Sequence, residues 1–235
     1  MKYKRKNINF FKIYDKYIVP LEKNSIVLEI WPGNWNFSYY LYKKFNLSEN
    51  NIYLLDISIT VIEKLKSQNE TKNFNIILSD SIEYLKKTNK KFDLIIMRHV
   101  LEHMKKDYIN KLIPYLINSL SDNWKILIEV PNLWNYPLGI YMFFWDYSHE
   151  TWFTEKSIKE CFLRNSTKEI EILTTNIFYP IEFTFNPLRL LKNILVRLIE
   201  FISIISTFLY RRIRGQWVRT PRLLCIIKIK TKKSK

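Results

Sequence analysis

Glycine, histidine and cysteine are all scarce in this sequence of 235 residues, with three, three and two copies. The usual glycine share of about 7% would give roughly sixteen. The two cysteines, Cys161 and Cys225, make no disulfide framework and do not have the spacing of metal ligands. This excludes the small disulfide-rich secreted class, and we expect a reducing, cytoplasmic compartment.

Long unbroken apolar runs are also missing. The basic N-terminal segment, residues 1–20, lacks the apolar region and small-residue cleavage site of a signal peptide. In the apolar part of the C-terminal region, the longest stretch without Lys or Arg covers residues 198–210 and still contains Glu200. A membrane-spanning helix requires roughly 20 apolar residues. We therefore expect this stretch to lie at the membrane surface and not to cross the membrane.

The composition itself is globular, with 47% apolar and 26% charged residues. At this length we expect one domain over residues 1–235. The net charge of +16 is concentrated at the two ends, because residues 1–23 have a balance of +5 and residues 182–235 one of +11. Basic ends on a neutral body favour contact with membrane headgroups or nucleic acid. A coding bias toward Lys and Asn is the alternative explanation for the lysines.

Apolar runs of strand length alternate with amphipathic helical patterns up to residue 131. The runs are SIVLEI from Ser25, NIYLLDI from Asn51, FNIILSD from Phe74, KFDLIIM from Lys91 and WKILIEV from Trp124. Nearly continuous apolar strands between helices are typical of a parallel sheet covered on both faces. With two later strands, near residues 168–179 and 222–230, the pattern predicts a doubly wound, mostly parallel, seven-stranded Rossmann-like α/β sheet.

Acidic residues end the second and third of these strands. Asp56 lies where a carboxylate can accept both hydroxyl groups of a ribose. Asp80, followed by Ser81, lies where a carboxylate can contact the amino group of an adenine. Each carboxylate alone is also an ordinary helix N-cap. Together, at the ends of neighbouring strands, they indicate a nucleotide-like ligand.

A tight turn follows the first strand, with the register Glu29, Trp31, Gly33, Trp35. With these motifs in this order, the chain resembles the class I S-adenosylmethionine-dependent methyltransferases over about residues 20–180. That family has an acidic residue followed by alternate glycines at this turn, and a fourth strand that runs into a phrase like FDLIIMRHVLEHM. The resemblance implies S-adenosylmethionine (SAM) as the cofactor. The cofactor-binding residues that it implies are Glu29, Trp31, Gly33, Trp35, Asp56, Ile57, Asp80, Ser81, Met97 and His99.

The phrase HVLEH permits a second interpretation. His99, Glu102 and His103 match the H-x-x-E-H pattern of an inverted zinc peptidase motif. That site requires both histidines on one helix face and a third ligand from elsewhere, whereas His99 directly follows a strand. We therefore expect no metal, and the methyltransferase resemblance places His103 near the substrate.

His149 lies in the phrase DYSHETWFTEKSIKECF, which resembles a substrate-side segment of methyltransferases that modify cell-surface glycans and lipids. A histidine with a pKa near neutral can take a proton from an acceptor hydroxyl, so His103 and His149 are the candidate catalytic residues. One alternative for His149 is a structural bond to a loop carbonyl. Another is catalysis by alignment of the two reactants without a base.

The seven tryptophans stand where glycine is expected. Trp31 and Trp35 occupy the alternate glycine positions of the turn, and Trp124 follows Asp122 and Asn123 like the glycine of an Asn-Gly turn. A side chain in a left-handed turn costs about 1–2 kcal/mol, and an indole there would occupy cofactor space. We hypothesise that these tryptophans are misread glycine codons, from a lineage that decodes UGA as glycine. The alternative is a diverged methyltransferase fold that no longer binds the cofactor.

Residues 186–216 form an apolar and basic segment before the last strand. Apolar residues recur from Leu188 to Leu209 at alternating intervals of three and four, which marks one face of a helix, and Arg211, Arg212 and Arg214 follow. We expect an inserted amphipathic helix at an anionic membrane surface. Packing against the sheet or in a dimer contact is the alternative.

These features predict a cytoplasmic enzyme, peripheral to the inner face of the membrane, that methylates an oxygen of a glycan, a lipid-linked sugar or another small acceptor. An RNA methyltransferase is the competing class. Such an enzyme would usually add an RNA-binding module or place basic residues beside the active site. The sequence displays neither feature, so nucleic acid is the less favoured partner.

Overall fold

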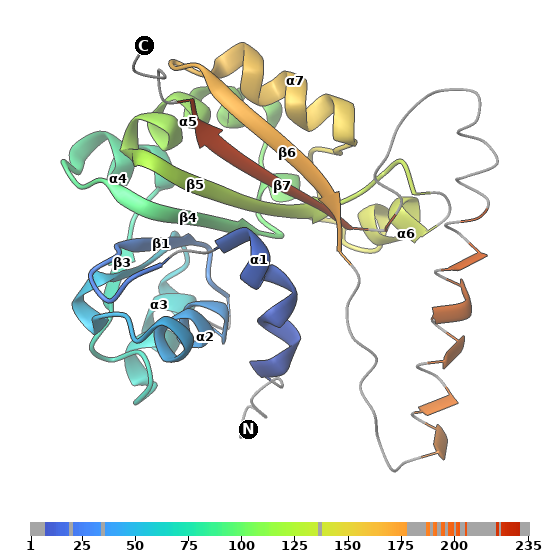
Figure 1. Cartoon of the computed structure of the whole chain (residues 1–235), viewed down its shortest axis with the longest axis horizontal. Coiled ribbons are helices and arrows are strands. Elements are labelled where there is room, and N and C mark those ends of the chain that lie inside the picture. Colours follow the sequence, from blue (N-terminus) through green and yellow to red (C-terminus); the bar gives the residue numbers. More distant parts are fainter. Residues whose placement is uncertain are drawn as a thin grey trace.

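A computed structural model of the chain describes residues 8–18, 21–33, 36–135, 138–177, 220 and 222–230, together with separate positions between 187 and 205. Seven strands form one sheet in the order β3-β2-β1-β4-β5-β7-β6 (Figure 1). Strands β1 to β5 run parallel, and β7 is antiparallel to both of its neighbours. The predicted doubly wound, mostly parallel seven-stranded sheet is confirmed.

The strands are β1 (Val27–Ile30), β2 (Ile52–Asp56), β3 (Asn75–Leu78), β4 (Phe92–Arg98), β5 (Leu120–Pro131), β6 (Ile170–Asn176) and β7 (Arg222–Ile229). The α-helices are α1 (Asp15–Ile18), α2 (Asn36–Phe45), α3 (Ile59–Ser67), α4 (Ser81–Lys87), α5 (Lys106–Ser119), α6 (Leu138–Phe144) and α7 (Glu155–Asn165). Short 3-10 helices are η1 (Ile8–Tyr14), η2 (Glu49–Asn51) and η3 (Leu101–His103).

Two elements differ from the sequence-based expectation. β5 begins at Leu120, before the predicted start at Trp124, because Leu120 already pairs with Phe92 of β4 across an irregularity in register. α6 lies beyond residue 131, where the alternating pattern of strands and helices ends and the sequence predicts no helix. Thr154 caps the N-terminus of α7, since its side chain accepts from the Ser157 N–H at 3.1 Å.

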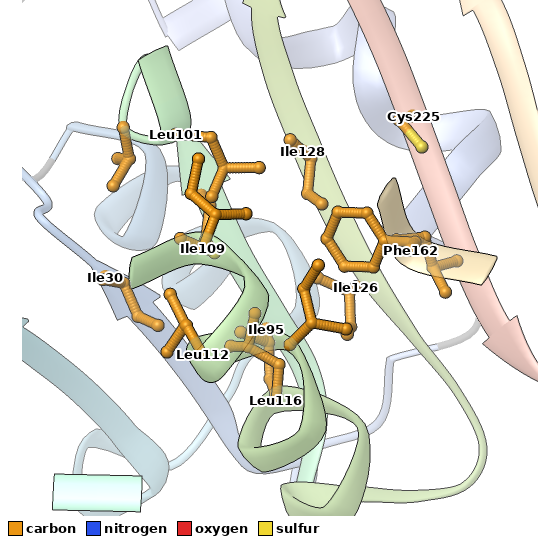
Figure 2. Close-up of a cluster of buried hydrophobic side chains, with 14 of the residues drawn as sticks. Ile30, Ile95, Leu101, Ile109, Leu112, Leu116, Ile126, Ile128, Phe162 and Cys225 are labelled. Carbon is orange, nitrogen blue, oxygen red and sulfur yellow. The ribbon is translucent and has the colours of Figure 1, made fainter. Parts of the chain in front are cut away.

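The alternation of side chains along the strands divides the core into two apolar clusters, one on each face of the sheet. Leu28 and Ile30 belong to the cluster with α5 and α7, and Val27 belongs to the one with η1, α1, α2 and α3. Figure 2 shows Leu112 and Leu116 of α5 packed over the strands of the first cluster. Burying side chains of this kind contributes about 1.5–3 kcal/mol each.

The predicted inserted helix lies largely outside the described residues. The described positions between 187 and 205 have helical backbone and lie apart from the sheet (Figure 1). Nine of the apolar residues among them, from Leu188 to Ile205, are 42–77% exposed, whereas Leu190 is partly buried. No helix within the described part of the chain has the length and hydropathy that a bilayer crossing requires.

Candidate functional site

The carboxyl ends of the parallel strands meet at one edge of the sheet. Ile30 of β1 pairs with Leu55 of β2 and Met97 of β4, and Asp56 of β2 pairs with Leu78 of β3. The predicted site residues at or just beyond these strand ends therefore share that edge. They are Trp31, Gly33, Asp56, Ile57, Asp80, Ser81 and His99, whereas Trp35 lies outside the described residues.

The turn after β1 has the left-handed backbone that the sequence pattern predicts. Trp31 has φ 53° and Gly33 has φ 55°, and a Cβ added to Gly33 would meet no atom within 4 Å. The backbone N–H of Trp31 donates to the Leu55 carbonyl at 2.7 Å, which fixes the turn to β2. The half-buried indole packs against the cluster beneath α5, and its ring centroid lies 6.3 Å from that of His103.

Among the described tryptophans, Trp31 alone has a positive φ. Trp124, predicted at the glycine position of a turn, lies instead inside β5, and its side chain packs against both apolar clusters. This prediction was wrong because β5 starts before the Asp-Asn pair rather than after it. Of the described tryptophans, only the one in the turn after β1 therefore has a glycine-like backbone.

Glu29 fastens helix α2 to β1. Its buried carboxylate Oε2 accepts the Ser38 N–H at 3.2 Å and also the Ser38 hydroxyl, in the first turn of α2. Burial raises the pKa of Glu29, against the opposing effects of the Ser38 bonds and the Arg98 charge. Glu29 therefore connects β1 to the start of α2, the two elements that the turn joins.

Asp56 and Ile57 present a polar and an apolar surface side by side. Asp56 is buried, its Oδ1 accepts the Ser58 N–H at 2.8 Å, and burial raises the pKa of its carboxyl. Ile57 is 55% exposed beside it. A carboxylate next to an exposed aliphatic side chain suits the ribose hydroxyls and the base of an adenosine. The residues present therefore fit the adenosine half of SAM, whereas the Trp31 indole stands at the turn expected to adjoin its methionine half.

Asp80 is the N-cap of α4, the alternative role considered for it from the sequence. Its Oδ1 accepts from the N–H groups of Ile82 and Glu83 at 2.9 and 3.1 Å. Its Oδ2 accepts from the Tyr108 hydroxyl at 2.6 Å, and burial together with this bond raises the pKa of Tyr108 to about 12. Ser81 is buried at the start of α4, and the Met97 side chain is fully buried in the apolar cluster, so only the backbone of Met97 reaches the edge.

His99 is held between two carboxylates. It has φ 54°, and its ring nitrogens lie 3.1 Å from Glu102 Oε1 and 3.3 Å from Glu129 Oε1. Burial alone would lower the pKa of His99, but the Glu129 charge and the bond to Glu102 raise it to about 9. His99 is therefore a cation at neutral pH.

Sequence reasoning missed Glu129, which is completely buried in β5. Arg98 Nε lies 2.9 Å from its Oε2, and the Tyr14 hydroxyl donates to the same oxygen at 2.5 Å. Although burial opposes ionisation, Arg98 and His99 hold the pKa of Glu129 well below its usual value. The only signal in the sequence was one carboxylate inside the apolar run WKILIEV.

The structure brings His103 and His149 together, with ring centroids 4.6 Å apart. His149 Nδ1 lies 2.6 Å from the Phe143 carbonyl, which can only accept, so Nδ1 carries a proton. His103 Nδ1 lies 2.8 Å from Ser148 Oγ, whose own proton is donated to Asp146 at 2.6 Å. In their neutral forms both rings therefore have the lone pair on Nε2.

Comparisons with known proteins agree with this geometry. A family model described as a methyltransferase domain matches residues 4–165. The fold is similar to that of a SAM-dependent methyltransferase from Archaeoglobus fulgidus, at 20% identity over 96% of both chains with a TM-score of 0.64. It is also similar to a SAM-dependent methyltransferase from Clostridium acetobutylicum, at 12% identity over 95% of this chain and 90% of that one, TM-score 0.59. No protein of curated function matches the sequence.

Proposed function

The chain belongs to the methyltransferase-domain family, and we propose that it moves a methyl group from SAM to an oxygen of a glycan, a lipid-linked sugar or another small acceptor. Membership makes it an enzyme of the class I SAM-dependent methyltransferase type with SAM as its cofactor. SAM supplies a methyl group on a sulfonium, which is a good leaving group. The enzyme's own part is then to align the acceptor and to remove its proton.

The observation that supports an oxygen acceptor is the pair of histidines beside the turn. His149 and His103 have Nε2 lone pairs in their neutral forms, and the Trp31 ring lies next to His103. A neutral imidazole at this place can take the proton of a hydroxyl as the methyl group arrives. His99 cannot do so at neutral pH, because its pKa is about 9.

The apolar segment, residues 186–216, supports a lipid-linked acceptor. All of its described apolar residues except the partly buried Leu190 are exposed, including Leu188 at 77% and Phe201 at 60%. Arg211, Arg212 and Arg214 follow in the sequence. We therefore propose that this segment lies on an anionic membrane surface, where exposed apolar side chains and arginines both find partners. The enzyme would then be peripheral to the cytoplasmic face of the membrane.

Two measurements test the proposed function. Calorimetry with S-adenosylhomocysteine (SAH) is done on the native chain and on the Trp31→Gly/Trp35→Gly variant. Transfer of radiolabelled methyl groups from SAM is then measured with glycolipid, soluble oligosaccharide and RNA fractions. We expect label on the glycolipid or oligosaccharide and a fall of about 10²–10⁴-fold for His149→Gln. Label on RNA alone would overturn the proposed acceptor class.

A further inference from the structure

Three potential metal ligands converge beside the turn after β1. One ligand atom from each of Glu102, His103 and His149 lies within 4.8 Å of those of the other two. Glu102 and His103 come from η3, and His149 comes from the loop after α6. The fold therefore joins two distant parts of the sequence at one point, which we name the Glu-His-His cluster.

The environment of the Glu102 carboxylate is a second, independent observation that points to a bound cation. Its side chain is 1% exposed, and its Oε1 lies 3.1 Å from His99 Nδ1. Its Oε2 is buried and has no hydrogen-bond partner within the described part of the chain. A buried carboxylate oxygen without a partner is costly, and a bound cation would satisfy it.

Both histidines of the cluster are also oriented by hydrogen bonds at Nδ1. His103 Nδ1 is bonded to Ser148, which is bonded in turn to Asp146, and His149 Nδ1 is bonded to the Phe143 carbonyl. Metal-binding histidines almost always donate their second ring N–H to a carboxylate, a carbonyl or another acceptor of this kind. The Nε2 atoms are then left for the ion.

We propose that Glu102, His103 and His149 bind a divalent cation of the zinc type, with an open position for the acceptor hydroxyl. Two histidines and one glutamate are a ligand set of catalytic zinc sites. In a tetrahedral site with bonds of about 2.1 Å, ligand atoms lie about 3.4 Å apart. The separations in the cluster, all within 4.8 Å, would therefore shorten by at most about 1.4 Å on binding, a distance that side-chain rotation can supply.

The proposed site departs from the expectation of no metal that was drawn from the sequence. The phrase HVLEH supplies Glu102 and His103, but the third ligand is His149. His99 is excluded as a metal ligand because its two ring nitrogens already face Glu102 and Glu129.

The inference rests on the proposed function and deepens it, because it names how the acceptor hydroxyl is activated. A hydroxyl bound to the cation has a lowered pKa, so its proton passes to solvent water. The electron pair left on oxygen forms the O–CH₃ bond, while the S–CH₃ bond breaks and its pair stays on sulfur. His103 and His149 then serve as metal ligands, and proton removal no longer requires either of them as a base.

The test is a Co²⁺ titration of the full chain after treatment with a chelator. We expect one equivalent to bind, with visible absorption bands that Zn²⁺ abolishes. His103→Gln and His149→Gln should each weaken binding at least 100-fold, and Ser148→Ala about 10–100-fold. Cys161→Ser is the matched control, because it removes a partly exposed thiol outside the cluster and should leave the titration unchanged.

Absence of Co²⁺ bands at millimolar metal, or equal binding by His149→Gln, would overturn the inference. SAH calorimetry on the Trp31→Gly/Trp35→Gly variant separates this failure from that of the proposed function. If SAH binds and Co²⁺ does not, the metal site is overturned and the methyltransferase proposal stands. If neither SAH nor Co²⁺ binds, both the metal site and the proposed function are overturned.

Discussion

Among single residues, Trp31 is the one whose side chain we expect to obstruct the cofactor. Its φ of 53° is unfavourable for a non-glycine residue, and its indole stands at the turn beside His103. We predict that Trp31→Gly strengthens SAH binding at least tenfold, about 1.4 kcal/mol, as measured by calorimetry. Stability should change little, since relief of about 1–2 kcal/mol of backbone strain offsets the lost burial of the indole.

Trp31→Ala is the matched control for this prediction. It removes the indole and keeps a Cβ in the left-handed conformation, so it should gain affinity for SAH and lose stability. If neither variant binds SAH better than the native chain, the indole does not obstruct the cofactor. Reading the codons decides the related question of origin, because seven UGG codons would exclude misread glycine.

The two carboxylates at the strand ends should separate into a binding role and a structural one. Asp56→Ala is predicted to weaken SAH binding by about 10–100-fold, since hydrogen bonds to a charged group contribute about 1.5–3 kcal/mol. Burial already raises the pKa of Asp56, so its removal should cost little stability. Asp80→Ala is the counterpart, because it removes the α4 cap and the Tyr108 bond and should cost about 0.5–2 kcal/mol of unfolding free energy.

Calorimetry and urea unfolding on both variants measure this contrast. An unchanged SAH affinity in Asp56→Ala would contradict the assignment of Asp56 to the ribose. A fully stable Asp80→Ala would contradict the structural role of Asp80.

At the scale of elements, Glu129 joins η1, β4 and β5 through Tyr14, Arg98 and His99. The pKa of Glu129 is held well below its usual value, so its contribution to stability is present above the unfolded-state pKa of about 4.3. That contribution is lost as the pH falls through the folded-state pKa. We predict that the melting temperature of the native chain declines steeply on acidification below about pH 4.

Glu129→Gln should lose about 3–5 kcal/mol at pH 7, because it leaves the charge of Arg98 without its buried counter-ion. Its melting temperature should then fall less on acidification than that of the native chain. Glu171→Gln, on the exposed face of β6, is the control and should follow the native chain. Parallel acid profiles for native chain and Glu129→Gln would contradict the role of Glu129.

The order of elements was predictable from the sequence, whereas the polar connections between them were not. The apolar runs predict the strands because parallel strands are buried on both faces, and all five runs before residue 131 lie in the sheet. The partners of Glu102 and Glu129 depend on which loops meet at the sheet edge. A pattern of single residues contains no such long-range information, so the cluster around His149 emerged only from the fold.

At the scale of the whole molecule, the exposed apolar residues between 188 and 205 and the basic charge of residues 182–235 belong to the same part of the chain. We predict that the full chain binds vesicles containing phosphatidylglycerol and binds pure phosphatidylcholine far more weakly, because the anionic leaflet attracts Lys and Arg by about 1 kcal/mol each. Sedimentation with the vesicles measures both affinities, and added salt should reduce the difference between them.

The double variant Leu198→Glu/Ile202→Glu isolates the apolar contribution. Both side chains are more than half exposed, so the change should leave the melting temperature and SAH affinity unaltered while reducing vesicle binding more than tenfold. Leu173→Glu, which alters an equally exposed leucine on β6, should bind vesicles like the native chain. If the double variant instead loses stability, these residues pack within the molecule. If it changes nothing, the arginines alone hold the protein at the membrane, and the apolar face has another partner.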